Sequence, residues 1–181
     1  IYERQIIEAN LSKKQHYLEK RHEALEYLTK FTTTELRAAM REVIARTANV
    51  MEINRVSVWF YEELDHRQVI SCIGLYTLST RSFSNHLELS SRDFPYYFKC
   101  LKMHSQLIIP DPTDIKLNQE LSSYLTTFHI ISKLDIPIVF EDHLLGVLCC
   151  EETRHQKDWE LEDCHFGKTI AEIIAIMMEQ S

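Results

Sequence analysis

The stretch that most constrains the fold is Lys133–Glu152, in which two apolar runs are joined by a short polar link. The runs Ile136–Phe140 and Leu144–Cys150 have strand length, and the link between them has hairpin length, so they predict an antiparallel strand pair. Neither run alternates cleanly between apolar and polar residues, which predicts strands covered on both faces, in the middle of a sheet. Because Pro137 cannot donate a ladder hydrogen bond, we expect it near the start of its strand or at a bulge.

The remainder of the chain predicts helices and short strands in alternation. Hydrophobic periodicity and capping residues favour helices over residues 3–31, 32–51, 94–103, 114–127 and 161–180. Further strands are predicted over residues 55–61, 68–76, 86–89 and 106–109, and residues 77–85 are predicted to be an exposed loop. About six strands, mostly antiparallel, with helices on the faces of the sheet, predict an α+β domain.

The two terminal helices suggest self-association. The first places Leu11, Leu18 and Leu25 on one heptad position, which is a weak coiled-coil seam. The last, Leu161–Gln180, is apolar nearly all round, so it needs cover on more than one side. One side can lie on the sheet and a second copy can cover the other, so we expect a homodimer through the N- and C-terminal helices.

Charge and cysteine content exclude several classes of protein. The net charge of −7, without a basic stripe, argues against nucleic acid or an anionic membrane as a partner. No apolar run approaches the ~20 residues that span a bilayer. An odd number of cysteines, five, with no C-x-x-C motif and no secretory signal predicts reduced thiols and a cytoplasmic location. The chain opens on Ile1 and stops at Ser181 within a helical pattern, so we expect a piece of a longer protein.

A set of short motifs, taken in their order along the chain, resembles the GAF domain of bacterial signalling proteins such as sensor histidine kinases and diguanylate cyclases. The motifs are Arg55-Val56-Ser57-Val58-Trp59, Ile109-Pro110-Asp111, Leu134-Asp135-Ile136-Pro137-Ile138, Leu145-Gly146-Val147-Leu148-Cys149 and Asp158-Trp159.

The resemblance implies a GAF-like (PAS-like) sheet of about six antiparallel strands, with the first and last domain helices on one face and a ligand pocket on the other. It implies a signalling helix over residues 1–31 and a GAF domain over residues 32–181 that ends in an output-linking helix. Relatives often carry Thr at the position of Glu160, so here we expect Asp158 to cap the last helix instead.

For a small-molecule pocket the candidate residues are Tyr76, Tyr97, Asp111 and Asp135, which combine aromatic surface with polar anchors. The alternative is that the aspartates cap a turn and a strand end while the tyrosines pack.

Cys100 and Cys149 are the candidates for redox sensing, and the alternative is that both are packing residues. Bilin-binding members of the family attach the chromophore through a pocket cysteine, but the Asp-Ile-Pro here lies in a strand context unlike the photoreceptor motif. The cyclic-nucleotide signature Asn-Lys…Phe-Asp-Glu has no equivalent. The cofactor is therefore left unknown.

Neither a metal site nor a catalytic constellation can be assembled from the sequence. The nine histidines are scattered, and we expect them on the surface or in loops. The acidic residues that begin with Glu151-Glu152 are interpreted as a solvated face and a helix N-terminus.

These observations lead to three hypotheses of function. The first is a non-catalytic sensory module that binds a small molecule or senses redox state and passes the change through its terminal helices to a downstream output domain. The second is a dimerisation scaffold with a vestigial pocket. The third is a redox enzyme similar to the GAF proteins that reduce free methionine sulfoxide.

Overall fold

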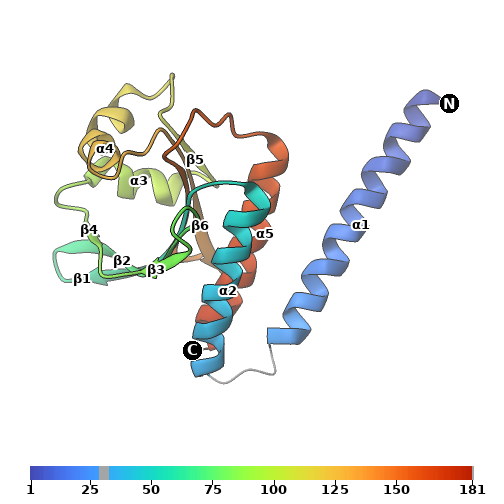
Figure 1. The fold of residues 1–181 in the computed structure, drawn as a ribbon, viewed down its shortest axis with the longest axis horizontal. Helices are drawn as coiled ribbons and strands as arrows, with labels where there is room; N and C mark the ends of the chain where they lie inside the picture. The colour runs from blue at the N-terminus through green and yellow to red at the C-terminus, as the bar shows by residue number, and fades with distance from the viewer. Residues whose placement is uncertain (29–32, 181) are drawn as a thin grey trace.

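The computed structural model describes residues 1–28 and 33–180, and within them a seven-stranded sheet lies between two helix layers (Figure 1). The strand order is β3-β2-β1-β7-β6-β5, all pairs are antiparallel, and β4 pairs with β2 beside this path. The boundary predicted between residues 31 and 32 lies outside the described residues. The strands are β1 (Arg55–Leu64), β2 (Arg67–Thr77), β3 (Ser82–Ser84), β4 (Glu88–Ser90), β5 (Leu107–Ile109), β6 (Ser132–Phe140) and β7 (His143–Glu152).

The predicted central hairpin is confirmed as the pair β6–β7, and β7 lies between β1 and β6. Phe140 pairs with His143, so the turn consists of Glu141 and Asp142 alone, which have φ values of 48° and 64°. Positive φ at both central residues is the geometry of a type I′ turn, whose twist matches that of the strands it joins.

Pro137 lies in the middle of β6, opposite Val147, and a register shift follows it between Ile138 and Val139. The neighbouring strand β5 pairs with β6 only over Lys133–Asp135. Pro137 therefore lies where β6 has a hydrogen-bonded neighbour on one side only, which is where a sheet accepts a residue without a backbone donor.

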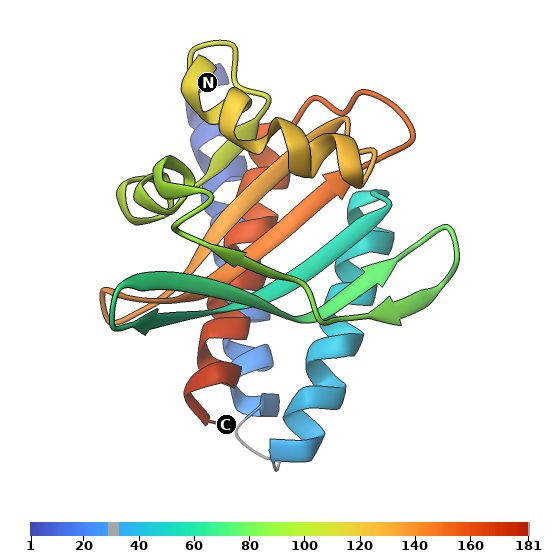
Figure 2. The same cartoon turned by 90° about the vertical axis from the view of Figure 1, so that its left-hand side faces the viewer.

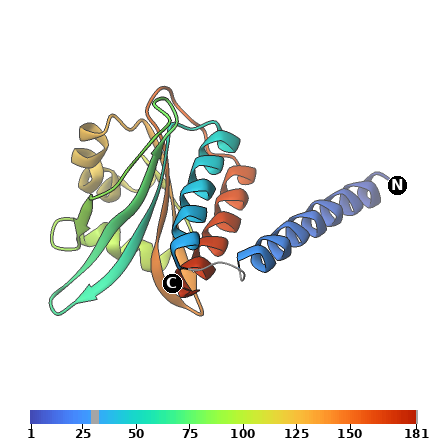
Figure 3. The same ribbon diagram turned by 60° about the horizontal axis from the view of Figure 1, so that its bottom comes forward.

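Helices α2 (Thr33–Met51) and α5 (Leu161–Gln180) lie side by side on one face of the sheet (Figure 3). Because side chains of a strand alternate between the faces, Val56 and Val58 of β1 and Ile136 of β6 point to this layer. A Cβ on Gly167 of α5 would lie 2.3 Å from Ile136 Cδ1, so at this approach of α5 to β6 any larger residue requires the Ile136 side chain to shift.

Helices α3 (Pro95–Met103) and α4 (Ile115–Thr127) cover the opposite face (Figure 2). Asp114 caps α4 by accepting a hydrogen bond from the Leu117 backbone N–H. The core of this layer contains Trp59, Tyr61, Ile70, Tyr97, Leu101, Leu117, Leu121 and Tyr124.

Two local expectations were wrong. The predicted loop 77–85 contains strand β3, which the sequence hides because only Phe83 in Ser82–Ser84 is apolar; its ring packs 4.9 Å from that of Tyr76. Helix α5 begins at Leu161, and Asp163 accepts a hydrogen bond from the Glu160 backbone N–H at 2.9 Å. Asp163, in the first turn, therefore stabilises the start of the helix, whereas we expected Asp158 to cap it.

Helix α1 (Tyr2–Leu28) lies beyond α5, which it contacts, and its N-terminal end points away from the sheet and its covering helices (Figure 3). Over residues 1–16 every side chain is exposed, including Ile7 at 58% and Leu11 at 60%. The side chains of Leu18 and Leu25, which complete the predicted seam, lie outside the described set. Among the described helices none is long and apolar enough to cross a membrane.

Candidate ligand-binding site

Strand register gathers four charged side chains on the face of the sheet that α3 and α4 cover. Lys133 and Asp135 lie two residues apart on β6, so they share a face, and Lys133 pairs with Glu151 of β7. Arg55 of β1 pairs with Glu151 from the other side. We call Lys133, Asp135, Glu151 and Arg55 the Lys133 cluster.

Ion pairs connect the members of the Lys133 cluster in the interior. Lys133 Nζ lies 2.7 Å from Asp135 Oδ1 and 2.9 Å from Glu151 Oε2. Arg55 Nε donates to Glu151 Oε1 at 3.1 Å. Both carboxylate residues are 0% exposed and Lys133 is 2% exposed. Two positive and two negative groups balance the charge, which is the condition under which buried ions are tolerated.

Two tyrosines close the cluster from the helix layer. The hydroxyl of Tyr97, on α3, donates to Asp135 Oδ2, and the hydroxyl of Tyr124, on α4, donates to Glu151 Oε2 at 3.1 Å. Lys133 Nζ lies 5.1 Å from the centroid of the Tyr124 ring, within the range of a cation–π interaction. Each of the two covering helices is therefore tied to the sheet through a carboxylate of the cluster.

The electrostatics of the two carboxyl groups differ. Burial raises the pKa of Asp135, and the nearby Lys133 ammonium only partly offsets this. Burial also acts to raise the pKa of Glu151, but Lys133 and Arg55 together outweigh it and lower that pKa. Burial opposes the charge on Lys133, yet the carboxylate of Asp135 and other neighbours raise its pKa well above the ordinary value. Glu151 is thus the more strongly held anion, and Asp135 is the group closer to accepting a proton.

One donor of the cluster remains unused. Within the described residues Arg55 Nη2 is buried and has no hydrogen-bond partner. The Arg55 guanidinium lies 5.0 Å from the centroid of the Phe128 ring, which covers it at the end of α4. A buried donor without a partner costs free energy, so this nitrogen is a natural contact for an acceptor atom of a ligand.

The candidate residues of the sequence divide between this site and others. Tyr97 and Asp135 are hydrogen-bonded to each other, and Cys149 pairs with Asp135 across β6–β7. Tyr76 faces the α2–α5 layer, on the other side of the sheet. Asp111 lies in the turn before α4, where it accepts hydrogen bonds from the backbone N–H and the hydroxyl of Thr113.

Cys100 lies on α3 and is 2% exposed. Burial raises its pKa and also raises that of Cys149 well above the ordinary thiol value. Both side chains pack within the core on the α3–α4 face. The structure thus places the two redox candidates where the reactive thiolate is disfavoured.

Sequence reasoning missed Lys133, Arg55, Glu151 and Tyr124. The interpretation of Glu151 and Glu152 as part of a solvated face was wrong, because both are 0% exposed. Glu152 points to the other face, where it accepts hydrogen bonds that include one from Arg154 Nη2 at 2.8 Å. One signal in the sequence could have indicated these residues. Lys133 and Asp135 lie two positions apart in one apolar strand, and Glu151 lies at the end of the next.

The space between the sheet and α3–α4 is filled by the protein's own side chains. Trp59, Tyr97, Leu117 and Leu121 are each at most 1% exposed there. A cavity of about 690 Å³ opens at the edge of this face, between Tyr61 of β1, Leu101 of α3 and Leu144 of β7, and another of about 760 Å³ lies under α2. Within the described residues no group of three or more His, Cys, Asp or Glu side chains could hold a metal ion.

An antiparallel sheet between a helix pair on one face and two short helices over a polar cluster on the other defines a small three-layer α+β domain. A sequence model of the GAF domain matches residues 35–178, and the chain belongs to this family. A comparison with curated protein sequences gave no match.

Solved structures confirm the fold. The blue-light absorbing form of the Thermosynechococcus elongatus PixJ GAF domain has 14% sequence identity and a TM-score of 0.66, and the match covers 81% of this chain and 86% of that one. The phycoerythrobilin-bound GAF domain from a cyanobacterial phytochrome has 16% identity and a TM-score of 0.70, with 91% and 94% covered. The chromophore-binding domain of the bacteriophytochrome RpBphP3 from R. palustris has 16% identity and a TM-score of 0.66, with 92% and 61% covered. At these identities the likeness concerns the fold alone.

The residues present do not fit a covalently attached bilin. Among the described residues that line the cavity at the edge of the α3–α4 face none is a cysteine, and the Cys100 side chain is buried in the core of that face.

Proposed function

We propose that this GAF domain is a non-catalytic sensory module of a bacterial signalling protein, and that it responds to a small polar molecule at the Lys133 cluster. The response would pass through α5 to a downstream output domain. A GAF domain of similar fold is bound to phycoerythrobilin, which supports a small-molecule ligand for this domain, and the packing of the α3–α4 face here favours a ligand much smaller than a bilin.

The observation that carries the proposal is the dipeptide Asp135-Ile136 of β6. Asp135 points to the helix layer above the cluster, where it holds Tyr97 of α3. The next residue, Ile136, points to the opposite face, where its Cδ1 lies against Gly167 of α5, 2.3 Å from the position that a Cβ would take. A change in the hydrogen bonds of Asp135 would therefore move or tilt the strand at the point where α5 rests on it.

The chemistry of the cluster indicates what a ligand would do. A small molecule with hydrogen-bonding groups could replace the Tyr97 or Tyr124 hydroxyl at its carboxylate and could accept a hydrogen bond from Arg55 Nη2. Either replacement would release a covering helix from the sheet. The ligand would shift a population between closed and open arrangements of this face.

Hydrogen exchange tests the coupling. Tyr97→Phe removes the hydroxyl that holds Asp135, and we expect faster amide exchange in β6 and in the part of α5 around Gly167. The matched control is Tyr96→Phe, since the hydroxyl of Tyr96, also on α3, donates to Asp114 at 2.9 Å, outside the cluster. Unchanged exchange of α5 in Tyr97→Phe, with faster exchange in β6, would remove the support for a relay through this dipeptide.

Native mass spectrometry of the purified protein tests the ligand. A small molecule that is retained by the wild type and lost in Arg55→Lys, which removes the Nη2 donor and keeps the positive charge, would support sensing at the cluster. The closed packing of this face favours one other function, the dimerisation scaffold with a vestigial pocket. That alternative predicts no retained molecule and no transmission of the Tyr97→Phe effect to α5.

A further inference from the structure

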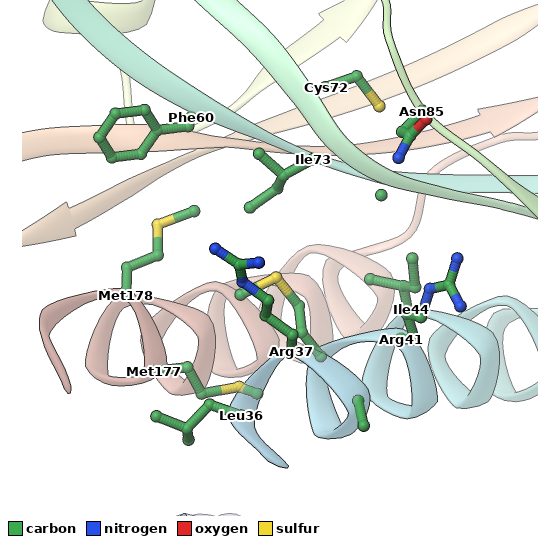
Figure 4. Close-up of a pocket in the computed structure, with 13 residues that line it drawn as sticks. Leu36, Arg37, Arg41, Ile44, Phe60, Cys72, Ile73, Asn85, Met177 and Met178 are labelled. Carbon is green, nitrogen blue, oxygen red and sulfur yellow. The ribbon is translucent and has the colours of Figure 1, made fainter. Parts of the chain in front are cut away.

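A cavity of about 760 Å³ lies on the other face of the sheet, between α2, the end of α5 and strands β1 and β2 (Figure 4). Its walls are mainly apolar and include Met40 and Ile44 of α2, Phe60 of β1, Ile73 of β2 and Met177 of α5. We call it the α2–α5 cavity. Its volume is in the range of about 300–1,000 Å³ that small-molecule pockets occupy.

An irregularity in β2 leaves the space for this cavity. The β1–β2 register shifts after Val58, so Ile73 has no partner on β1. Ile73 is 44% exposed, and Gly74 beside it has no side chain. A Cβ at Gly74 would lie 3.6 Å from Ile44 Cδ1, an ordinary contact, so an alanine fits there and a larger side chain would occupy part of the cavity.

The charge of the α2–α5 cavity is opposite to that of the whole protein. Thirteen of the residues that the structure describes line it, and these include Arg37 and Arg41 but no aspartate or glutamate, although the chain has a net charge of −7. The two arginines lie four residues apart on α2, so they are neighbours on one side of the helix. In Figure 4 the Arg37 side chain extends from α2 toward the strands that carry Phe60 and Ile73. Arg41 lies with its guanidinium carbon 4.8 Å from the centroid of the Phe83 ring.

We propose that the α2–α5 cavity is a binding site for a medium-chain carboxylate, with its apolar chain between α2, β2 and α5 and its carboxylate paired with Arg37, while Arg41 adds positive charge from its place on the Phe83 ring. The apolar walls supply the burial that such a chain requires. Guanidinium groups bind carboxylates through two parallel hydrogen bonds, which makes arginine well suited to the charged end. Three methionines in the wall, Met40, Met177 and Met178, adapt to chains of different shape.

This site is independent of the Lys133 cluster, because the sheet separates the two. A carboxylate here would contact α2, β2 and α5 at once, and so would stabilise the packing of the two helices against the sheet. A different occupant, such as a second copy of the chain, would cover the same apolar wall. Its binding would not depend on a small carboxylate near the two arginines.

Calorimetric titration with octanoate and with 1-octanol tests the proposal on the full chain. The two compounds have the same apolar chain and differ in the charged end. We expect saturable binding of one octanoate per protein chain and binding of octanol that is at least about tenfold weaker, because the charge-assisted hydrogen bonds are absent. Equal affinities, or no saturable binding of octanoate, would overturn the proposal.

Substitutions locate the site. Arg37→Gln should weaken octanoate binding about tenfold, Arg41→Gln should weaken it by a smaller factor, and both should leave octanol binding unchanged. Arg46→Gln is the matched control, since Arg46 lies on the same helix but pairs with Glu42 and does not line the cavity. Gly74→Val should abolish binding of both compounds, while Gly74→Ala should retain it. Octanoate affinity that is unaffected by both Arg37→Gln and Arg41→Gln, or that falls equally in Arg46→Gln, would contradict the assignment even if Gly74→Val failed to fold.

Discussion

Lys133 and Glu151 face each other across the β6–β7 pair, and an Nζ–Oε2 distance of 2.9 Å joins them where neither side chain is more than 3% exposed. The same ammonium holds Asp135, so one lysine neutralises two buried carboxylates with the help of Arg55. The stability of the α3–α4 face therefore depends on a charge that the sequence places in the middle of a sheet.

Substitution of this lysine should be strongly destabilising. Lys133→Met leaves Asp135 without its cation and Glu151 with Arg55 alone, and we expect the free energy of unfolding to fall by about 3–5 kcal/mol. Urea unfolding monitored by circular dichroism measures the change. Lys102→Met is the control, because Lys102 pairs with Glu63 at 3.4 Å with both side chains about half exposed, and exposed pairs contribute at most about 1 kcal/mol. Similar losses in the two variants would show that the cluster does not stabilise the fold.

Protonation of Glu151 should contribute to the loss of stability at low pH. Lys133 and Arg55 outweigh the effect of burial and lower its pKa from the ordinary 4.5, so the folded state binds this proton less readily than the unfolded state. Its contribution is complete above pH 4.5 and is lost as the pH falls through the lowered value. Asp135 acts in the opposite direction, because its raised pKa makes its contribution largest at low pH.

Urea midpoints measured between pH 6 and the acid-unfolded range should therefore fall less steeply below pH 4.5 in Glu151→Gln than in the wild type. Glu42→Gln, which removes a carboxylate from the exposed pair with Arg46, is the control and should keep the slope of the wild type. An unchanged slope in Glu151→Gln would mean that its carboxylate is not the group whose protonation weakens the fold.

The two strand glycines should respond differently to one added methyl group. A Cβ on Gly146 would lie 1.9 Å from the Trp59 carbonyl oxygen, so Gly146→Ala must push β1 and β7 apart, and we expect a loss of at least about 1–3 kcal/mol. Gly74→Ala meets only Ile44 Cδ1 at 3.6 Å and should be neutral or stabilising by up to about 1 kcal/mol. Thermal unfolding of the two variants checks the contrast, and equal melting temperatures would contradict the close approach at Gly146.

Much of this fold could be predicted from the order of apolar runs. The hairpin around residues 141–143, the two faces of β1 and the helices on each side follow from period and length. Strand β3 could not be predicted, since a single Phe83 between two serines has no strand pattern and is ordered by its contact with Tyr76. The start of α5 was misplaced because the choice between Asp158 and Asp163 depends on backbone geometry near Glu160.

The site was predictable only in part. Tyr97 and Asp135 were selected for their chemistry, and the structure joins them by a hydrogen bond. Glu151 was taken for a solvated residue because local sequence does not show that Lys133 and Arg55 lie on either side of it in the sheet. Pairing register between strands far apart in sequence decides which buried charges meet, and periodicity carries no such information.

The thiols should be unreactive in the folded protein. All five cysteines are buried, and burial raises the pKa of Cys72 to about 11 and that of Cys149 well above its ordinary value. Titration with an aromatic disulfide reagent at pH 8 should therefore label the native protein slowly and all five thiols rapidly in denaturant. Rapid labelling of one native thiol, lost in Cys149→Ser or Cys100→Ser and retained in Cys164→Ser, would favour the redox-sensing hypothesis over the small-molecule one.

The exposed apolar side chains of α1 lead to the last prediction, a homodimer through the terminal helices. Ile7 and Leu11 are 58% and 60% exposed on adjoining turns of a helix whose N-terminal end points away from the sheet and its covering helices (Figure 3). We expect a dimer at tens of micromolar protein in sedimentation equilibrium, because a second copy would bury this seam. Leu11→Glu should raise the dimer dissociation constant at least about tenfold, since it places a charge in the seam. Ser12→Glu adds the same charge on the neighbouring residue, off the seam, and should leave the constant within a few-fold of the wild type. A wild-type chain that sediments as a monomer at these concentrations, or equal weakening by the two substitutions, would contradict pairing through α1.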